Sequence, residues 1–272
     1  MTLLQGIVLA VVQGLTEFLP VSSTAHLILV PWLLGWEDPG LTYDVVLHAG
    51  TLLAVVVYFA RDWLGMLGAL FGGRVPTGLP GSRRLLGLIV LATIPAALAG
   101  YFLESYAESV LRGPLVVAGA LIAVGLLMGV ADRRESLQRE VKSVEAADAI
   151  IIGVAQAVAL VPGTSRAGIT IAAGLFRNLT RESAARFSFL LATPILAGAT
   201  VKKAWEVWQQ GFPPGLTGVD FAVGFGVAAV TGYAAISFLL RYLQVGTLKI
   251  FVAYRLALGV IILGVEFLRS AA

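Results

Sequence analysis

Six apolar stretches, each long enough to cross a lipid bilayer as an α-helix, dominate this sequence. About 20 residues of helix are needed for one crossing. Backbone N–H and C=O groups inside a bilayer must be hydrogen-bonded within the protein, as they are in helices and in closed β-barrels. Because this chain has so many long apolar runs, a helical bundle is favoured over a barrel. The expected spans are residues 41–60, 84–103, 114–131, 183–203, 219–240 and 249–268. We therefore predict an all-α integral membrane protein with six transmembrane helices.

Composition supports this class and excludes others. Of the 272 residues, 58% are hydrophobic and 13% are charged, well below the charge content of soluble domains. The chain has no cysteine and two histidines, which excludes disulfides and makes a multi-histidine zinc site improbable. Any metal would be held mainly by oxygen, which favours Mg²⁺ or Ca²⁺. The net charge of +3 reflects membrane topology, not nucleic-acid binding.

Two further apolar segments are too short to span. Residues 3–19 end at Pro20, and residues 149–161 end at Pro162. Each is followed by a polar stretch and a second apolar half, 24–36 and 166–176 respectively. Helices of about 13 residues rise only about 20 Å. We predict that both segments are re-entrant helical hairpins.

The two hairpins resemble each other, which predicts an internal repeat. AVVQGLTEFLPVSSTAH (10–26) aligns with GVAQAVALVPGTSRAG (153–168), so that Gln13 matches Gln156 and Ser23 matches Ser165. The repeats cover about 1–131 and 148–272 of a single membrane domain, and a charged linker, 132–147, joins them as a solvated cytoplasmic loop. Each repeat holds three spans, an odd number, so the second copy is inverted and the hairpin tips meet near the midplane.

The bias of basic residues predicts the orientation. Most of the 19 lysines and arginines fall on the side that carries the linker. That side is expected to be cytoplasmic. Both termini and the mouth of the first hairpin then face outward.

The first tip carries polar groups suited to a reaction. Gln13 and Glu17 are spaced i, i+4 and share one helix face. After Pro20, the hydroxyls of Ser22, Ser23 and Thr24 can cap a new helix, and His26 falls in its first turn.

The second tip repeats this design with a positive charge. Gly163 permits close backbone approach, Thr164 and Ser165 offer hydroxyls, and Arg166 supplies a planar fork of donors. Two helix N-termini and an arginine at one place describe an anion site. Caps and kinks are the simplest reading of the hydroxyls alone, but ionisable groups inside a membrane favour function.

Two other ionisable residues are harder to place. His48 lies one turn after Asp44, and we expect a structural pair, with a role in lining the site left open. Arg255 either snorkels or pairs with an acid.

QGLTEFLPVSSTAH (13–26) and PGTSRAG (162–168) resemble the motifs of the bacterial undecaprenyl-diphosphatases associated with bacitracin resistance. The resemblance covers essentially the whole chain. It implies a bacterial plasma-membrane enzyme that hydrolyses undecaprenyl diphosphate and so recycles the lipid carrier for cell-wall synthesis, with dependence on Mg²⁺ or Ca²⁺. The family often has glutamate where this chain has Gln13, so the resemblance implies a cation held here with one fewer negative charge.

We expect a polyprenyl diphosphate between the tips, contacted by Gln13, Ser22, Thr24, Gly163, Thr164 and Ser165. Glu17 with Gln13 would hold the cation or orient water, and Arg166 would neutralise developing charge. The nucleophile is left open between Ser23, His26 and water. A transporter or flippase of a phosphorylated lipid using the same site is the alternative, and a lipid-binding scaffold is a third. Oligomeric state, including a homo-oligomer, is open.

Overall fold

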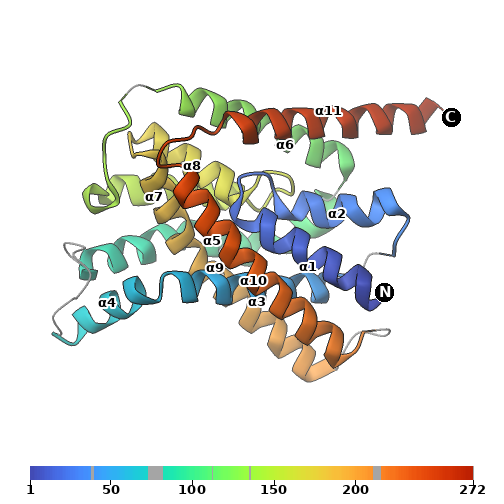
Figure 1. Cartoon of the computed structure of the whole chain (residues 1–272), viewed down its shortest axis with the longest axis horizontal. Helices are drawn as coiled ribbons and strands as arrows, with labels where there is room; N and C mark the ends of the chain where they lie inside the picture. Colours follow the sequence, from blue (N-terminus) through green and yellow to red (C-terminus); the bar gives the residue numbers. More distant parts are fainter. Residues whose placement is uncertain (38–39, 73–81, 112, 135, 211–215, 272) are drawn as a thin grey trace.

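The computed structural model describes residues 1–37, 40–72, 82–111, 113–134, 136–210 and 216–271, and this part of the chain is all-helical (Figure 1). Its elements are α1 (Leu3–Phe18), α2 (Ser23–Leu34), α3 (Leu41–Tyr58), α4 (Ala60–Leu70), α5 (Ser82–Val110), α6 (Pro114–Asp132), the 3₁₀ helix η1 (Val141–Ser143), α7 (Ala146–Val158), α8 (Arg166–Phe176), α9 (Arg181–Gln210), α10 (Gly218–Tyr242) and α11 (Lys249–Ala271).

Five helices in the described residues, α5, α6, α9, α10 and α11, are long and apolar enough to cross a membrane. They match five of the six predicted spans. The sixth, expected at 41–60, corresponds to α3, which bends by 71° into α4; the two helices together are long and apolar enough for either a broken span or a re-entrant loop. The bend directs Asp62 of α4 towards Arg186 of α9, whose Nη2 donates to both carboxylate oxygens at 2.7 and 2.8 Å. This ion pair fixes a turn that hydrophobicity alone does not predict.

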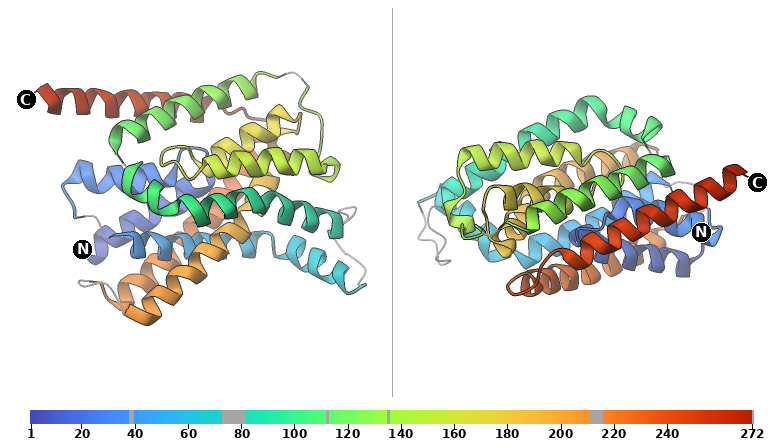
Figure 2. Two further views of the ribbon diagram at one scale, coloured as in Figure 1. Left: turned by 180° about the vertical axis from the view of Figure 1, so that it is seen from behind. Right: turned by 90° about the horizontal axis from the view of Figure 1, so that it is seen from above.

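Two short helical hairpins lie between these long helices. The chain breaks after Phe18 and restarts at Ser23, and it breaks again after Val158 and restarts at Arg166. In Figures 1 and 2 the hairpin of α1 and α2 opens at the end where both termini lie, and the hairpin of α7 and α8 opens at the opposite end. The two turns therefore meet in the middle of the bundle.

Small residues allow the hairpin helices to pack closely against long neighbours. A Cβ added at Gly14 of α1 would lie 1.8 Å from Thr231 Oγ1 of α10. A Cβ at Gly153 of α7 would lie 2.3 Å from the carbonyl oxygen of Ala92 in α5. Hairpin and long helix thus touch almost backbone to backbone, which fixes the height of each turn along the bundle.

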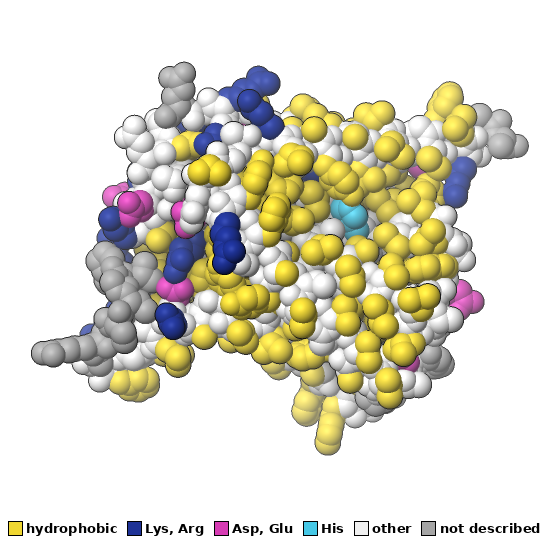
Figure 3. All heavy atoms as spheres, viewed as in Figure 1, with side chains coloured by type: hydrophobic (Ala, Val, Ile, Leu, Met, Phe, Trp, Pro, Cys, Tyr) yellow, Lys and Arg dark blue, Asp and Glu magenta, His cyan; other side chains and the backbone are white. Residues whose placement is uncertain are grey.

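Charged residues gather at the end opposite the termini, whereas the middle of the visible face is broadly hydrophobic (Figure 3). Arg181 Nε donates to Asp132 at 2.5 Å, and the second oxygen of Asp132 accepts from the backbone of Leu248. Arg139, in the predicted solvated linker, donates to Asp148 at 2.7 and 3.2 Å. The linker is therefore attached to the bundle, because Arg139 neutralises the carboxylate of Asp148, which is buried in α7.

Asp148 ties three segments together at the base of the second hairpin. It is buried in the first turn of α7 and accepts from Arg139 of the linker and from Arg177 Nε, at 2.6 Å, just after α8. Burial acts to raise the pKa of this carboxyl, but the hydrogen bonds from Arg139 and Arg177 outweigh it and lower the pKa to about 2 from the ordinary 3.8.

We predict that Asp148→Asn lowers the unfolding free energy by about 2 kcal/mol at neutral pH, because two partly buried arginines lose the negative charge and one of the two oxygens that accept their hydrogen bonds. Since the folded-state pKa of Asp148 lies below its ordinary value, the stabilisation is complete above about pH 4 and declines as the pH falls towards about 2. Thermal unfolding in detergent between pH 7 and pH 3 measures both effects.

The control is Glu140→Gln, which removes an exposed ion pair with Lys142 and should change the unfolding free energy little. A difference between Asp148→Asn and wild type that stays constant with pH would contradict this account.

Candidate functional site

The two hairpin turns end in the same unusual capping geometry. Ser22 (φ 79°) and Ser165 (φ 64°) are the N-caps of α2 and α8, and each side chain accepts from the backbone N–H three residues on. Positive φ is uncommon for a residue with a side chain. The sequence alignment matches Ser23 with Ser165, but the caps pair Ser22 with Ser165. Ser23 and Arg166 are consequently equivalent in position, because Ser23 is the first residue of α2 and Arg166 is the first residue of α8.

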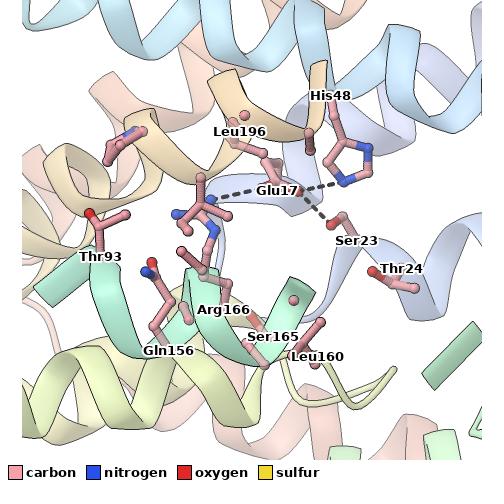
Figure 4. Close-up of a pocket in the computed structure, with 18 of the residues that line it drawn as sticks. Glu17, Ser23, Thr24, His48, Thr93, Gln156, Leu160, Ser165, Arg166 and Leu196 are labelled. Carbon is pink, nitrogen blue, oxygen red and sulfur yellow. Dashed lines mark hydrogen bonds and ion pairs between the residues drawn. The ribbon is translucent and has the colours of Figure 1, made fainter. Parts of the chain in front are cut away.

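Glu17 is the point where the two hairpins meet (Figure 4). Its Oε2 accepts from Ser23 Oγ at 2.6 Å and from Gln13 Nε2 at 3.1 Å. Its Oε1 accepts from Arg166 Nη2 at 2.7 Å, across 149 residues of sequence. The Glu17 side chain is 5% exposed and that of Arg166 12%. The structure thus brings together four predicted site residues, Gln13, Glu17, Ser23 and Arg166.

A cavity of about 750 Å³ opens beside this cluster. Predicted site residues in its lining are Glu17, Ser22, Ser23, Thr24, Gly163, Ser165 and Arg166. Gly163 has φ +90° and lies where a Cβ would meet the carbonyl oxygen of Val117 at 2.5 Å, so the turn requires glycine. Towards α5 and α9 the lining contains small apolar residues, Ala97, Gly100 and Gly198, together with the polar residues Thr93, Tyr101 and Lys202. The cavity thus combines the polar groups around Glu17 with a wall of mixed polarity.

Three predicted site residues lie outside the cavity lining that the described residues form: Gln13, Thr164 and His26. Gln13 is buried behind Glu17. Thr164 is buried, and its backbone carbonyl accepts from Arg255.

His26 is turned towards α11. Its Nδ1 lies 2.7 Å from the carbonyl oxygen of Ser22, and its Nε2 lies 2.6 Å from Tyr254 Oη, with the two rings stacked. A carbonyl can only accept, so Nδ1 carries a proton, and Nε2 of the neutral ring accepts from the tyrosine. In this arrangement the basic nitrogen of His26 is already occupied.

His48 lines the cavity, a role that the sequence alone left open. The carbonyl oxygen of Asp44, not its carboxylate, lies 2.7 Å from Nδ1 of His48. The proton is therefore on Nδ1, and Nε2 lies 3.5 Å from Glu17 Oε2 within the cavity lining. An ionisable group inside a predicted span was the available signal. His48 can receive a proton beside Glu17.

Arg255 neither snorkels nor pairs with an acid among the described residues. It is fully buried and donates to five carbonyl oxygens. Those of Pro20, Gly163 and Thr164 belong to the two hairpin turns, and those of Ala120 and Leu121 belong to α6. Irregular turns leave carbonyls without helical partners. Arg255 satisfies these groups and holds both turns against each other.

Several polar atoms at the site have no hydrogen-bond partner among the described residues. They are Gln13 Oε1, Arg166 Nη1, and both amide atoms of Gln156. Buried groups of this kind are costly and are retained mostly at functional sites. The described residues contain no group of three or more His, Cys, Asp or Glu that could hold a metal. The nearest candidate donors for a cation shared with a ligand are a Glu17 oxygen and the unpartnered Gln13 Oε1.

These features define a multi-pass helical membrane protein in which Glu17, Ser23 and Arg166 form a buried polar cluster beside a cavity. The family model described as bacitracin resistance protein BacA matches residues 6–261. The undecaprenyl-diphosphatase of Moorella thermoacetica is 46% identical over 269 residues, covering 99% of this chain and 100% of the relative. That of Geobacter sulfurreducens is 47% identical over 271 residues, covering 99% and 100%. The chain therefore belongs to the bacitracin resistance protein BacA family.

Proposed function

We propose that this protein hydrolyses undecaprenyl diphosphate to undecaprenyl phosphate and inorganic phosphate. The observation that carries the proposal is the contact of one carboxylate, Glu17, with both a hydroxyl, Ser23, and a guanidinium, Arg166, in one cavity. A phosphoanhydride hydrolase needs a base, a nucleophile and positive charge, and these groups supply all three. The name of the relatives, undecaprenyl-diphosphatase, supports the choice of substrate.

In the proposed reaction, Glu17 accepts the proton of the group that attacks the terminal phosphorus. Ser23 Oγ already donates to Glu17 at 2.6 Å, so Ser23 or a water in its place is the favoured nucleophile. The bond from the terminal phosphorus to the bridging oxygen breaks, and the lipid monophosphate leaves. Arg166 stabilises the charge that develops on the phosphate oxygens. If Ser23 attacks, water then hydrolyses the phosphoserine to release inorganic phosphate.

His26 takes part in this scheme only after it gives up its contact with Tyr254. A proton relay at the edge of the site suits it better than nucleophilic attack. His48 stands closer to Glu17 and can take over the proton that Glu17 receives.

We also propose that Mg²⁺ or Ca²⁺ acts at the site, held by Glu17 and Gln13 together with the phosphates. Such a cation, when bound, supplies positive charge that polarises the phosphoryl group. The protein contributes one carboxylate here, because Gln13 is neutral. We expect weak cation binding in the absence of the diphosphate.

The topology that fits this function has two re-entrant hairpins, an inverted repeat, and termini that face the outside of the bacterial plasma membrane. Supporting observations are the matching caps at Ser22 and Ser165, the opposite directions of the hairpins in Figure 1, and the basic residues at the linker end. The headgroup would then reach Glu17 from outside.

Phosphate release from purified protein and undecaprenyl diphosphate in detergent tests the activity. We expect turnover by the wild type and a loss of about 10²- to 10³-fold in kcat for Arg166→Ala, because a donor to the developing charge is removed. Rapid quenching should trap phosphate on Ser23 in an acid-stable form, or trap none if water attacks. An acid-labile phosphohistidine would overturn the assignment. Transport of the lipid by reconstituted protein without phosphate release would establish the flippase alternative instead.

The cation proposal predicts that Gln13→Glu lowers the Mg²⁺ concentration required for half-maximal activity. A second carboxylate beside Glu17 adds negative charge and an oxygen ligand. Gln13→Met, which removes the amide oxygen and adds no charge, is the control and should raise the required concentration. Activity measured against Mg²⁺ after removal of metal with EDTA gives both values. Full activity in EDTA, or equal Mg²⁺ requirements in all three proteins, would reject the cation site.

A further inference from the structure

Gln156 is a buried polar side chain in α7 whose role the proposed reaction does not explain. Its side chain lines the cavity, the residue is 3% exposed, and neither Nε2 nor Oε1 has a partner among the described residues. An amide removed from water without replacement hydrogen bonds is unfavourable. A ligand that supplies those hydrogen bonds accounts for a glutamine at this position.

Arg166 has a matching unused donor. Its Nη2 is engaged by Glu17, but Nη1 is buried without a partner in the described part of the chain. Guanidinium groups bind phosphate best with two N–H groups. Half of the Arg166 fork is therefore available.

Figure 4 places these unused groups on one side of the site. Gln156 lies with Thr93 on the Arg166 side of Glu17, whereas Ser23 and His48 lie on the other side. The small residues Ala97, Gly100 and Gly198 line the cavity from α5 and α9, the helices that supply Thr93 and Leu196. The same helices also contribute Tyr101 and Lys202 to the lining. A Cβ added at Gly100 or Gly198 would meet nothing within 4 Å, so this part of the cavity is open.

We infer that Gln156 is a substrate-binding residue that, with Nη1 of Arg166, binds the lipid-bearing phosphate of the diphosphate. The inference rests on the proposed function, in which Ser23 and Glu17 act on the terminal phosphate. Gln156 Nε2 donates to a phosphate oxygen, and the prenyl chain continues past Ala97 and Gly100. The two phosphates therefore occupy separate subsites on either side of the Glu17–Arg166 contact.

The subsite makes a specific prediction about product binding. The lipid monophosphate occupies the Gln156 subsite, whereas inorganic phosphate occupies the Ser23 side. Gln156→Met should weaken competitive inhibition by farnesyl phosphate about tenfold, the usual loss for one hydrogen bond to a charged group. Gln156→Glu should weaken it about 100-fold or more, because a carboxylate repels the phosphate. Inhibition by inorganic phosphate should remain within about twofold of wild type in both variants.

The same two variants separate binding from a purely structural role. If Gln156 served only to pair with Arg166, glutamate would keep an acceptor for the guanidinium and would preserve farnesyl phosphate binding, whereas methionine would not. The inference would be overturned if Gln156→Glu bound farnesyl phosphate better than Gln156→Met does. It would also be overturned if either variant lost inhibition by farnesyl phosphate and by inorganic phosphate to the same extent. Thermal unfolding of each purified variant checks that the fold is retained.

Direct binding of farnesyl phosphate, measured by calorimetry, distinguishes failure of this inference from failure of the proposed function. A protein that releases no phosphate from the lipid diphosphate, yet binds farnesyl phosphate and loses it in Gln156→Glu, would refute the hydrolase and keep the subsite. A protein that hydrolyses the diphosphate, but whose Gln156→Glu variant binds farnesyl phosphate as wild type does, would refute the subsite alone.

Discussion

A single buried carboxylate imposes most of the constraints on this structure. A carboxylate inside an apolar bundle is unstable unless charge and hydrogen bonds replace its water. Glu17 obtains them from Gln13 and Ser23 in its own hairpin and from Arg166 in the other hairpin. For those groups to converge, both helices must break at the same depth. The breaks in turn leave buried carbonyl groups without helical hydrogen-bond partners, and the fully buried Arg255 donates to them. The burial of Glu17 thus accounts for the two turns, for Arg166, which pairs with it, and for Arg255, which satisfies the carbonyl groups of the turns.

The same arrangement explains how a cluster of polar side chains can be buried within a membrane protein. The long helices α5, α6, α9, α10 and α11 supply the apolar exterior, and the short hairpins supply the polar interior. Ion pairs around Asp62, Asp132 and Asp148 fasten the opposite end of the bundle. Because Asp148 at the start of α7 binds Arg177 at the end of α8, it also holds the two helices of the second hairpin, and so Arg166, in place. The stability of the fold and the geometry of the site are therefore linked through the second hairpin.

Sequence patterns predicted the helical breaks, the capping serines and the convergence of Glu17 with Arg166, because each follows from local spacing and from the cost of burying a charge. They did not predict which way side chains point after a break. His26 was expected beside the anion but lies against Tyr254. His48 was expected to pair with Asp44, with a lining role left open; it contacts the Asp44 carbonyl and also faces Glu17 from the cavity lining. The role of Arg255 and the bend after Tyr58 depend on carbonyls and ion pairs contributed by helices far away in sequence. The alignment placed Ser165 opposite Ser23, and only the backbone angles reveal that Ser22 is its counterpart.

The central claim is that Glu17 and Arg166, 149 residues apart, work as one functional unit. A double-mutant cycle on kcat/KM for phosphate release, with Glu17→Gln, Arg166→Gln and the double variant, tests it most directly. The claim predicts strong non-additivity, so that the double variant is within about threefold of the less active single variant. If the two losses multiplied to give the double variant's activity, the residues would act independently, and the account of a shared site between the two hairpins would be contradicted.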